Sequence, residues 1–292
     1  MINYSFPLYR PPAEADNVIL QATYGCSHNQ CTFCSMYKTK KYQIREISDL
    51  FKDIDTLAAL YPDANKVFLG DGDALSLPTE YMITVLQYLK RSFPRLSRVS
   101  VYATAQNVLE KSEEELRLLQ ANLLNLIYFG IETGNDGLLK KINKGVSAKQ
   151  IIESLNKASA AKIKISATVI LGIGGEEYTA EHIKDTAAII NASTINYLST
   201  LQLGLENDVK ERFLKCFEHF QMLNDYQILD EQKRFLELLH PVNKVIFRSN
   251  HASNALHLAG TLPKDTMRLL DEVKFALAIG ERAFIPERFR GF

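Results

Sequence analysis

The stretch Thr23-Tyr24-Gly25-Cys26-Ser27-His28-Asn29-Gln30-Cys31-Thr32-Phe33-Cys34 carries the strongest signal in this sequence of 292 residues. It places three of the four cysteines within nine residues, spaced C-x4-C-x2-C, directly after an apolar run at residues 18–23. Thiolates are soft ligands that suit iron–sulfur clusters or zinc. Because most iron–sulfur clusters use four cysteine ligands, a loop with three would hold three irons of a [4Fe–4S] cluster and leave the fourth iron open.

Two other uses of the cysteines stay open. Cys26, Cys31 and Cys34 together with His28 make a Cys3His set, which is a common structural zinc site. The spacing favours iron–sulfur over zinc, because zinc sites usually draw their ligands from two separated pairs. The fourth cysteine, Cys216, stands alone in an apolar run. It is typical of a buried small hydrophobic residue, with a role as a distant fourth ligand as the alternative.

Composition excludes several classes of protein. The chain has 34 basic and 34 acidic side chains, 46% hydrophobic residues and 23% charged residues, which is typical of a globular protein. A chain without net charge has no bulk attraction to nucleic acid or to an acidic membrane. The first residues lack the pattern of a signal peptide, and no apolar stretch reaches the ~20 residues that span a bilayer. We therefore expect a cytoplasmic protein, in which clustered cysteines bind metal or act in catalysis.

Six short apolar runs, each bounded by Gly, Pro, Asn or Asp, predict buried strands. They lie at residues 18–23, 66–70, 98–104, 126–132, 163–172 and 197–203. Helical spacing falls between them, at residues 46–60, 79–93, 147–161 and 178–190, and a further helix is expected to begin at Ser112. This repetition predicts an α/β fold, a partial (β/α)6 TIM-like barrel with parallel strands, over residues 1–205.

The pattern changes at residue 206. Residues 208–225 and 229–239 predict two helices, residues 244–248 predict a short strand, and residues 264–280 predict a last helix. No stretch with the composition of a linker separates this part from the preceding one. We therefore expect residues 206–292 to form a C-terminal, mainly helical extension that packs on the barrel.

Glycines and carboxylates follow the second predicted strand, at the end where the loops of a β-α barrel gather its catalytic groups. Gly70 and Gly72 lack a Cβ, which lets the backbone approach a ligand closely. Asp71 and Asp73 can accept hydrogen bonds from an ammonium group. A plain tight turn is the alternative use of these four residues.

Two later strands end in a similar way. Glu132 ends an apolar strand, where a carboxylate is costly unless it is paired. A surface cap is one interpretation, but the flanking Gly130 and Gly134 favour contact with a ligand. After the fifth strand, Gly172 and Gly174 lie in a glycine-rich turn that lacks the third spaced glycine of a dinucleotide-binding loop.

The cysteine loop and the three strand-end segments, taken in chain order, resemble four elements of the radical S-adenosylmethionine (SAM) superfamily. The cysteine loop resembles the family's cluster loop, whose commonest form has one residue fewer between the first two cysteines. The segments 70–73, 130–134 and 172–176 resemble its methionine-binding, ribose-contacting and adenine-contacting elements. The resemblance covers about residues 15–205 and is nearest to the oxygen-independent coproporphyrinogen-oxidase-like branch, through residues 130–134 and 138–145.

The resemblance implies an enzyme with two cofactors, a [4Fe–4S] cluster and SAM. It implies reductive cleavage of SAM to a 5′-deoxyadenosyl radical that abstracts hydrogen from a substrate. The cluster ligands it implies are Cys26, Cys31 and Cys34. The SAM-binding residues it implies are Phe33, Gly70, Asp71, Gly72, Asp73, Glu132, Gly172 and Gly174. For Phe33, which would pack on the adenine, an ordinary core aromatic is the alternative.

Five further residues are candidates for contact with the substrate. Arg45 follows the cluster loop, Tyr102 and Gln106 lie at the end of the third strand, and Arg248 and His251 lie in a polar segment at residues 247–254. His251 is the acid–base candidate by residue type. A solvated charge run, for Arg45, and a hydrogen-bonded cap, for the later segment, are the alternatives.

The substrate is expected to be a small molecule, because the chain shows no second cysteine cluster and no RNA-binding module. An external one-electron donor is the expected partner, and neither nucleic acid nor membrane is expected. Two rival functions stay open. One is a non-catalytic zinc-binding or interaction protein that uses the cysteines and His28, and the other is a fold that binds SAM or haem without turnover.

Overall fold

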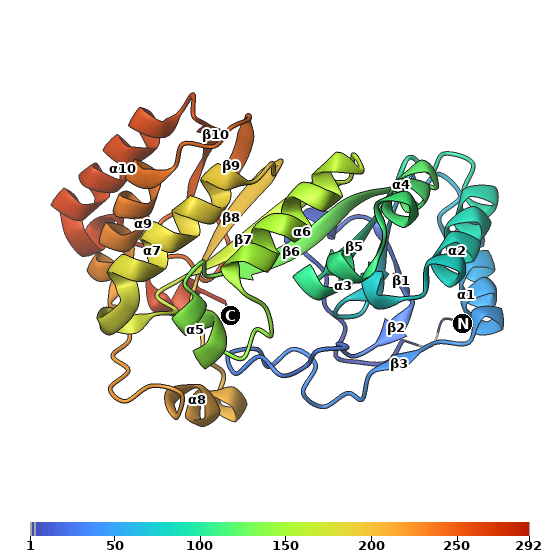
Figure 1. Cartoon of the computed structure of the whole chain (residues 1–292), viewed down its shortest axis with the longest axis horizontal. Helices are drawn as coiled ribbons and strands as arrows, with labels where there is room; N and C mark the ends of the chain where they lie inside the picture. Colours follow the sequence, from blue (N-terminus) through green and yellow to red (C-terminus); the bar gives the residue numbers. More distant parts are fainter. Residues whose placement is uncertain (1, 3, 292) are drawn as a thin grey trace. The chain divides into compact units, whose positions relative to one another are not determined.

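The computed structural model describes residue 2 and residues 4–291, which form two compact units. The first unit contains the chain up to Asn29, Met36–Phe129 and Lys157–Ile165. The second contains Gln30–Ser35, Gly130–Asn156 and the chain from Ser166 onward (Figure 1). Of the clustered cysteines, the first therefore belongs to one unit and the next two belong to the other. The predicted division at residues 205 and 206 stays a prediction.

The first unit is built on parallel strands. Their order is β1 (Val18–Gln21), β4 (Lys66–Gly70), β5 (Arg98–Ala103) and the first residues of β6 (Leu124–Glu132). Most side chains of these strands are buried, which agrees with the continuous apolar runs of the sequence. A short antiparallel pair, β2 (Thr23–Tyr24) with β3 (Gln43–Ile44), brackets the cysteine loop and was not predicted.

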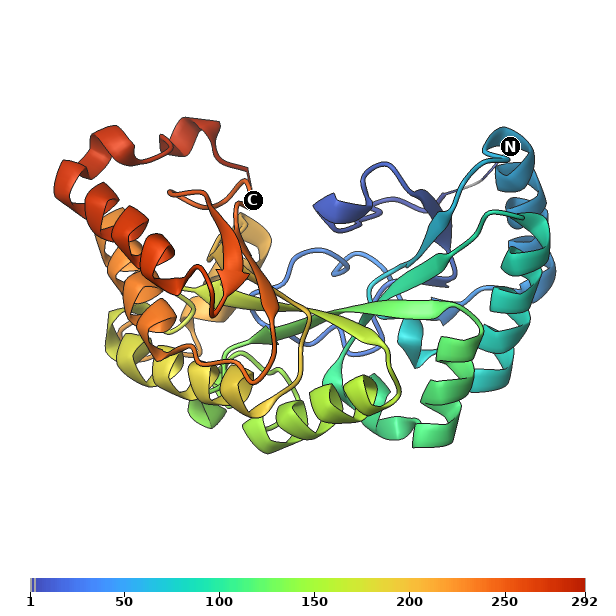
Figure 2. The same ribbon diagram turned by 90° about the horizontal axis from the view of Figure 1, so that it is seen from above.

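Helices fill the connections of the first unit. They are α1 (Ile47–Leu60), α2 (Thr79–Ser92), α3 (Ala105–Glu110) and α4 (Glu113–Ala121). Figure 2 shows α1 and α2 side by side along the strands. The predicted helix start at Ser112 is confirmed, because its hydroxyl accepts a hydrogen bond from the Glu115 amide in a capping box.

The second unit continues the alternation. Its strands follow the order β7 (Lys164–Leu171), β8 (Tyr197–Gln202), β9 (Val245–Ser249) and β10 (Leu258–Leu262). β8 pairs in parallel with β7 and β9, and β10 is antiparallel to β9. The helices are α5 (Asp136–Lys141), α6 (Ala148–Ala160), α7 (Gly175–Ala192), α8 (Asn207–Leu214), α9 (Asp225–Leu238) and α10 (Thr266–Ile279). Figure 1 shows α7, α9 and α10 beside one another.

The predicted α/β fold with parallel strands is confirmed, and all six predicted strands are present. One predicted helix is wrong in length. Residues 208–225 were expected to form one helix, but α8 ends at Leu214 and the next helix begins at Asp225. The side chain and amide of Asn224 form a capping box with Gln227, which starts α9 afresh. β10, the short helices α3 and α5 and the four-residue earlier start of α9 were not predicted.

A buried carboxylate lies at the amino ends of the first unit's strands. Glu14 belongs to the 3-10 turn Pro12–Glu14 and is fully buried. One carboxylate oxygen accepts from Arg98 Nη2 at 2.7 Å, from Ser100 Oγ at 2.9 Å and from the Tyr128 hydroxyl at 2.6 Å. Burial and this hydrogen bond raise the pKa of Tyr128. Glu14 therefore attaches the segment before β1 to strands β5 and β6.

The segment after α10 is attached to the second unit. Both terminal nitrogens of Arg290 donate to Asp225, the first residue of α9, at 2.7 and 2.6 Å. The Ile285 amide also donates to the Ala255 carbonyl at 2.8 Å. A bidentate pair of this kind is directional as well as strong. In the part of the chain that the structure describes, no helix combines the length and hydropathy needed to span a bilayer.

Candidate active site

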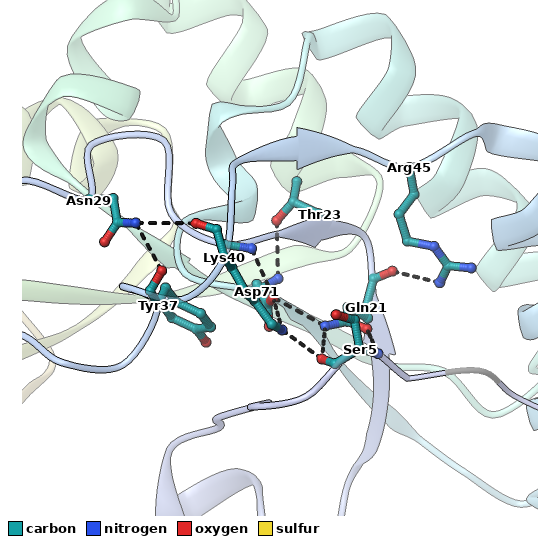
Figure 3. Close-up of polar contacts among 9 residues, drawn as sticks. Ser5, Gln21, Thr23, Asn29, Tyr37, Lys40, Arg45 and Asp71 are labelled. Atoms are coloured by element: carbon teal, nitrogen blue, oxygen red, sulfur yellow. Dashed lines mark hydrogen bonds and ion pairs between the residues drawn. The ribbon is translucent and has the colours of Figure 1, made fainter.

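Asp71 lies at the carboxyl end of β4 and joins both ends of the cysteine loop to that strand (Figure 3). Its Oδ2 accepts from Lys40 Nζ at 2.8 Å, the Gly25 amide at 3.0 Å and Gln21 Nε2 at 3.1 Å. Its own amide donates to Thr23 Oγ1 at 3.1 Å. Burial raises the pKa of Asp71, and the hydrogen bonds from Lys40 and Gly25 oppose that rise. The ammonium group that this carboxylate meets here is therefore the chain's own Lys40.

Asp73 and Gly72 contact the first cysteine of the loop. Asp73 accepts from the Ser27 amide at 2.8 Å, from the Ser27 hydroxyl and from Asn107 Nδ2 at 3.3 Å, and the Cys26 thiol also donates to it. Burial raises the pKa of Asp73. A Cβ on Gly72 would lie 2.7 Å from the Cβ of Cys26, which is closer than real Cβ atoms come. The sequence needs glycine at this position because the loop packs directly on the turn after β4.

Glu132, at the end of β6, turns back on its own strand to reach a lysine. Its φ of 61° lies in the left-handed region, and its Oε1 accepts from Lys144 Nζ at 2.8 Å. A Cβ on Gly130 would lie 1.9 Å from the same Oε1. Glycine at position 130 is therefore required by the path of the Glu132 side chain, a reason that the sequence alone did not reveal.

Lys144 also lies near the other two cysteines of the loop. Burial acts to lower its pKa, but Glu132 and the charges of Cys31 and Cys34 raise it above the usual value. The Thr32 amide donates to the Ile142 carbonyl at 2.9 Å, which fixes this half of the loop on the segment before Lys144. A buried cation beside two thiols favours the thiolate form, which is the form that binds metal.

The turn between β7 and α7 is held by a residue that sequence reasoning missed. The Gly172 amide donates to Glu231 Oε1, on α9, at 2.6 Å. Gly172 has a φ of 78°, and a Cβ there would lie 2.8 Å from the end of the Ile228 side chain. Gly174 packs against Tyr178. Glu231 is fully buried, and its burial raises its pKa to about 7.

A buried histidine lies next to Glu231 and was also missed. His182, on α7, has no exposed surface, and burial lowers its pKa to about 4. Its Nδ1 lies 2.9 Å from Thr133 Oγ1 and its Nε2 lies 3.9 Å from Glu231 Oε1. A signal was present for Glu231: it occupies the apolar stripe of its helix, between Ile228 and Phe235. Charged residues rarely lie in such a stripe without a partner.

The substrate candidates lie in different surroundings. Arg45 is buried and donates to Asp53 at 2.7 Å and to the Gln21 carbonyl at 2.9 Å. Tyr102 packs edge-on against Phe68 at a centroid distance of 5.1 Å. Gln106 is exposed on α3. The guanidinium of Arg45 is therefore engaged by the protein itself, which was not expected for a group that binds an anion.

Three other predicted residues lie in the second unit. Phe33 packs against a buried apolar cluster that includes Ile173, and the half-buried Cys216 packs there as well. Arg248 is exposed on β9 and donates to the carbonyl of the preceding residue. His251 Nδ1 lies 2.9 Å from Ser253 Oγ, and burial lowers the pKa of His251. The role of each in binding stays a prediction.

The chemistry of the cysteine loop fits an iron–sulfur cluster. All four cysteines carry thiols, and soft thiolates are the ligands that such clusters require. Among the residues that the structure describes, no three His, Cys, Asp or Glu side chains are gathered as a preformed metal site. Within the first unit, Cys26 lies with Gly72 and Asp73, and within the second, Cys31 and Cys34 lie near Lys144.

Known proteins resemble this chain over its barrel-like part. A family model described as the Radical SAM superfamily matches residues 20–190. The haem chaperone HemW of Bacillus subtilis is 26% identical over 183 residues, which are 60% of this chain and 48% of that protein. A putative methylthiotransferase of Methanocaldococcus jannaschii is 21% identical over 58% of this chain and 39% of its own length. The chain thus spans about half or less of these two relatives.

Solved structures agree in fold. Coproporphyrinogen III oxidase (HemN) from Escherichia coli, described as a radical SAM enzyme, superposes with a TM-score of 0.55 at 16% identity. The match covers 76% of this chain and 51% of that one. Methylornithine synthase (PylB) gives a TM-score of 0.53 at 14% identity, over 76% of this chain and 62% of that one.

Proposed function

Since its residues 20–190 match the family model, the chain belongs to the radical SAM superfamily, and we propose that it cleaves SAM reductively at a [4Fe–4S] cluster. The product would be a 5′-deoxyadenosyl radical that abstracts hydrogen from a substrate. The observation that carries the proposal is found in each unit: Cys26 lies with Gly72 and Asp73 after β4, and Cys31 and Cys34 lie near Lys144, the partner of Glu132 at the end of β6. A radical SAM enzyme has a [4Fe–4S] cluster and SAM as its cofactors.

Cys26, Cys31 and Cys34 would hold the cluster, which supplies the electron for cleavage when it is bound and reduced. Asp71 and Lys40 keep the two ends of the loop in place, because their ion pair is buried at 2.8 Å. Asp73 fixes the Ser27 amide and the first cysteine. These residues shape the loop before any cofactor binds, as a preorganised site requires.

Glu132 and the turn after β7 would bind SAM. One Glu132 oxygen accepts from Lys144, and a carboxylate has further lone pairs that can accept from the hydroxyls of a ribose. Gly172 and Gly174 give a turn whose backbone comes close to its neighbours. Lys144 orients the Glu132 carboxylate through the hydrogen bond that it donates. Phe33, Gly70 and Gly72 complete the proposed set.

The proposed substrate is a small molecule, and an external one-electron donor would supply the reducing electron. We place the protein in the cytoplasm, where thiols stay reduced and available to iron. Tyr102, Gln106, Arg45, Arg248 and His251 remain the candidates for contact with the substrate. Arg45 would act through the loop, since its guanidinium already binds Asp53.

Anaerobic reconstitution tests this proposal. The wild-type chain should bind about four irons, show the spectrum of a [4Fe–4S] cluster, and form 5′-deoxyadenosine from SAM when reduced with dithionite. The C34S variant should lose the cluster and the product. The matched C216S variant removes a thiol that packs in an apolar cluster and should keep both. Stoichiometric zinc without iron would support instead the rival site of the three cysteines and His28.

Haem binding is the second candidate function, favoured by the likeness to HemW proteins named as haem chaperones. Titration of the reconstituted chain with haem, followed by the Soret absorbance, measures this directly. Saturable haem binding without formation of 5′-deoxyadenosine would favour a carrier. Formation of 5′-deoxyadenosine without saturable haem binding would favour the radical enzyme.

A further inference from the structure

Two titratable side chains in the second unit are fully buried and have no part in the roles proposed above. Glu231 extends from α9 and His182 from α7, and neither has measurable exposure. Burying such groups is costly unless they are hydrogen bonded. Their hydrogen-bond partners therefore indicate the role of these two side chains.

Glu231 uses both oxygens on the turn that follows β7. Oε1 accepts from the Gly172 amide at 2.6 Å, and Oε2 accepts from the hydroxyl of Thr179, in the first turns of α7. A hydrogen bond from a backbone amide to a carboxylate is stronger than one between neutral groups. The carboxylate therefore fixes the two ends of the glycine turn relative to each other.

His182 extends this contact to the strand end that carries Glu132. Its Nδ1 lies 2.9 Å from the hydroxyl of Thr133, the residue after Glu132. Thr186, one turn further along α7, accepts from the Gly134 amide at 2.7 Å. The segment after β6 and the turn after β7 thus rest on the same helix, beside the same buried carboxylate.

The charges around Glu231 are few. Arg234, on the same helix, lowers its pKa and also pairs with Asp230 at 2.9 Å. On α7 the only facing group that can titrate, among the described contacts, is His182 at 3.9 Å. Burial places the pKa of His182 at about 4 and that of Glu231 at about 7. Near neutral pH the imidazole is therefore uncharged, and Glu231 is the group that changes charge.

We propose that Glu231, supported by His182, is a positioning residue that sets the affinity of the SAM site by fixing the Gly172 amide, an inference that rests on the proposed function. In its ionised form Glu231 holds the turn through a charge-assisted hydrogen bond. In its protonated form it holds the turn by a weaker, neutral one. SAM affinity therefore depends on pH through a group that does not touch SAM.

The test is the dissociation constant of SAM for the reconstituted full chain, measured by equilibrium dialysis at pH 6, 7 and 8. We expect wild-type protein to bind about fivefold more tightly at pH 8 than at pH 6, the gain of a charged over a neutral hydrogen bond. Glu231→Gln keeps the shape of the protonated acid, so its affinity should stay at the pH 6 value throughout. Glu237→Gln, an exposed change on the same helix, should behave as wild type.

A second measurement needs no cofactor. Hydrogen–deuterium exchange of the peptide around Gly172 reports directly on its amide in the full chain without cluster. Glu231→Ala should speed this exchange at least tenfold, while Glu237→Ala should leave it unchanged. Exchange that is equal in the two variants would overturn the role of Glu231 in holding the turn.

The two proposals fail in different ways. If wild-type protein with its cluster binds SAM and Glu231→Gln keeps the wild-type pH dependence, the positioning role is wrong and the proposed function stands. If wild-type protein holds no cluster and binds no SAM at any of the three pH values, the proposed function is wrong and the positioning role falls with it. Circular dichroism of each variant establishes that it folds.

Discussion

Each of the two units contains a buried carboxylate–lysine pair at the carboxyl end of a strand. Asp71 pairs with Lys40 after β4, and Glu132 pairs with Lys144 at the end of β6, both at 2.8 Å. The surroundings differ. Asp71 is fully buried and also accepts from Gly25 and from a glutamine, whereas the one described hydrogen bond to the Glu132 side chain comes from Lys144.

This difference indicates a structural role for Asp71 and a ligand-binding role for Glu132. Three donors of the chain meet one oxygen of Asp71, which ties this carboxylate to the fold, while its other oxygen, Oδ1, is buried without a hydrogen-bond partner among the described residues. A carboxylate with one such partner, held in place by a glycine that gives it room, can still accept from a bound molecule. The sequence predicts contact with SAM for both Asp71 and Glu132. We propose that Glu132 contacts SAM and that Asp71 holds the cysteine loop, because three donors around Asp71 come from residues at or beside that loop.

Replacing Asp71 should have the largest effect on the stability of the protein. Asp71→Ala leaves the buried Lys40 ammonium without its carboxylate, with the Ser5 carbonyl as its other acceptor, which should cost about 3–5 kcal/mol of unfolding free energy. Urea denaturation measures this loss. The matched change Asp49→Ala breaks an exposed pair with Lys52 and should leave the unfolding free energy essentially unchanged. Equal stability of the two variants would contradict the assignment of Asp71 as a structural clamp.

The contributions of His182 and Asp71 to stability should respond to pH with opposite signs. In the second unit, the pKa of His182 is lowered from 6.5 to about 4, so its contribution to stability is complete above pH 6.5 and is lost as pH falls to 4. The loss amounts to about 3 kcal/mol. In the first unit, the raised pKa of Asp71 means that its contribution falls as pH rises above 3.8.

Urea denaturation of wild type and His182→Gln between pH 4 and pH 7 separates these contributions. The raised pKa of Glu231 acts in the opposite direction over the same range in both proteins, so the measured quantity is their difference: the stability of the wild type relative to the variant should rise by about 3 kcal/mol from pH 4 to pH 7. An unchanged slope in His182→Gln would show that other groups govern the pH dependence.

The third prediction concerns the room that Glu132 needs. Gly130→Ala would place a Cβ 1.9 Å from Glu132 Oε1 and push the carboxylate away from Lys144. We expect a cost of about 1–3 kcal/mol in unfolding free energy, together with loss of SAM binding. Gly291→Ala, whose new Cβ would have its nearest neighbour at 3.6 Å, is the control and should be neutral.

Replacing Glu132 by glutamine should have the smallest effect on stability. In Glu132→Gln the amide oxygen still accepts from Lys144, so the protein should fold, while SAM affinity should fall about tenfold through loss of the charge. Asp71→Asn should show the reverse, a larger loss of stability and a smaller loss of affinity. Glu153→Gln, exposed on α6, serves as control in both measurements. Identical behaviour of the Asp71 and Glu132 amides would remove the distinction between the two pairs.

Much of the fold could be predicted because its signals are local. Six apolar runs bounded by turn residues identified the six parallel strands, and the cysteine spacing identified the loop. The same local logic failed at residues 215–224. Phe213, Phe217 and Phe220 have helical spacing, but they form one aromatic cluster across a turn, with ring centroids 4.8–5.0 Å apart.

Partners far apart in the sequence could not be predicted. Asp71 accepts a hydrogen bond from Lys40, and the Gly172 amide donates one to Glu231. Neither spacing along the sequence follows from a helical or strand period or from a motif. The partner of Arg45 could not be predicted either, although it lies close in the sequence. The closeness of Arg45 to the cysteine loop suggested an anion site, yet Asp53 on the first helix neutralises it. Residue type indicates which side chains could bind a ligand. Only the three-dimensional contacts show which of them already bind another residue of the chain.

The ion pair between Arg290 and Asp225 has a practical consequence for anyone who handles this protein. Asp225 begins α9, and the same helix carries Glu231 two turns later. Cleavage of the chain before Arg290 would remove both hydrogen bonds to Asp225 and should loosen the start of the helix that holds the Gly172 turn. Shortened variants of the chain should therefore retain Arg290.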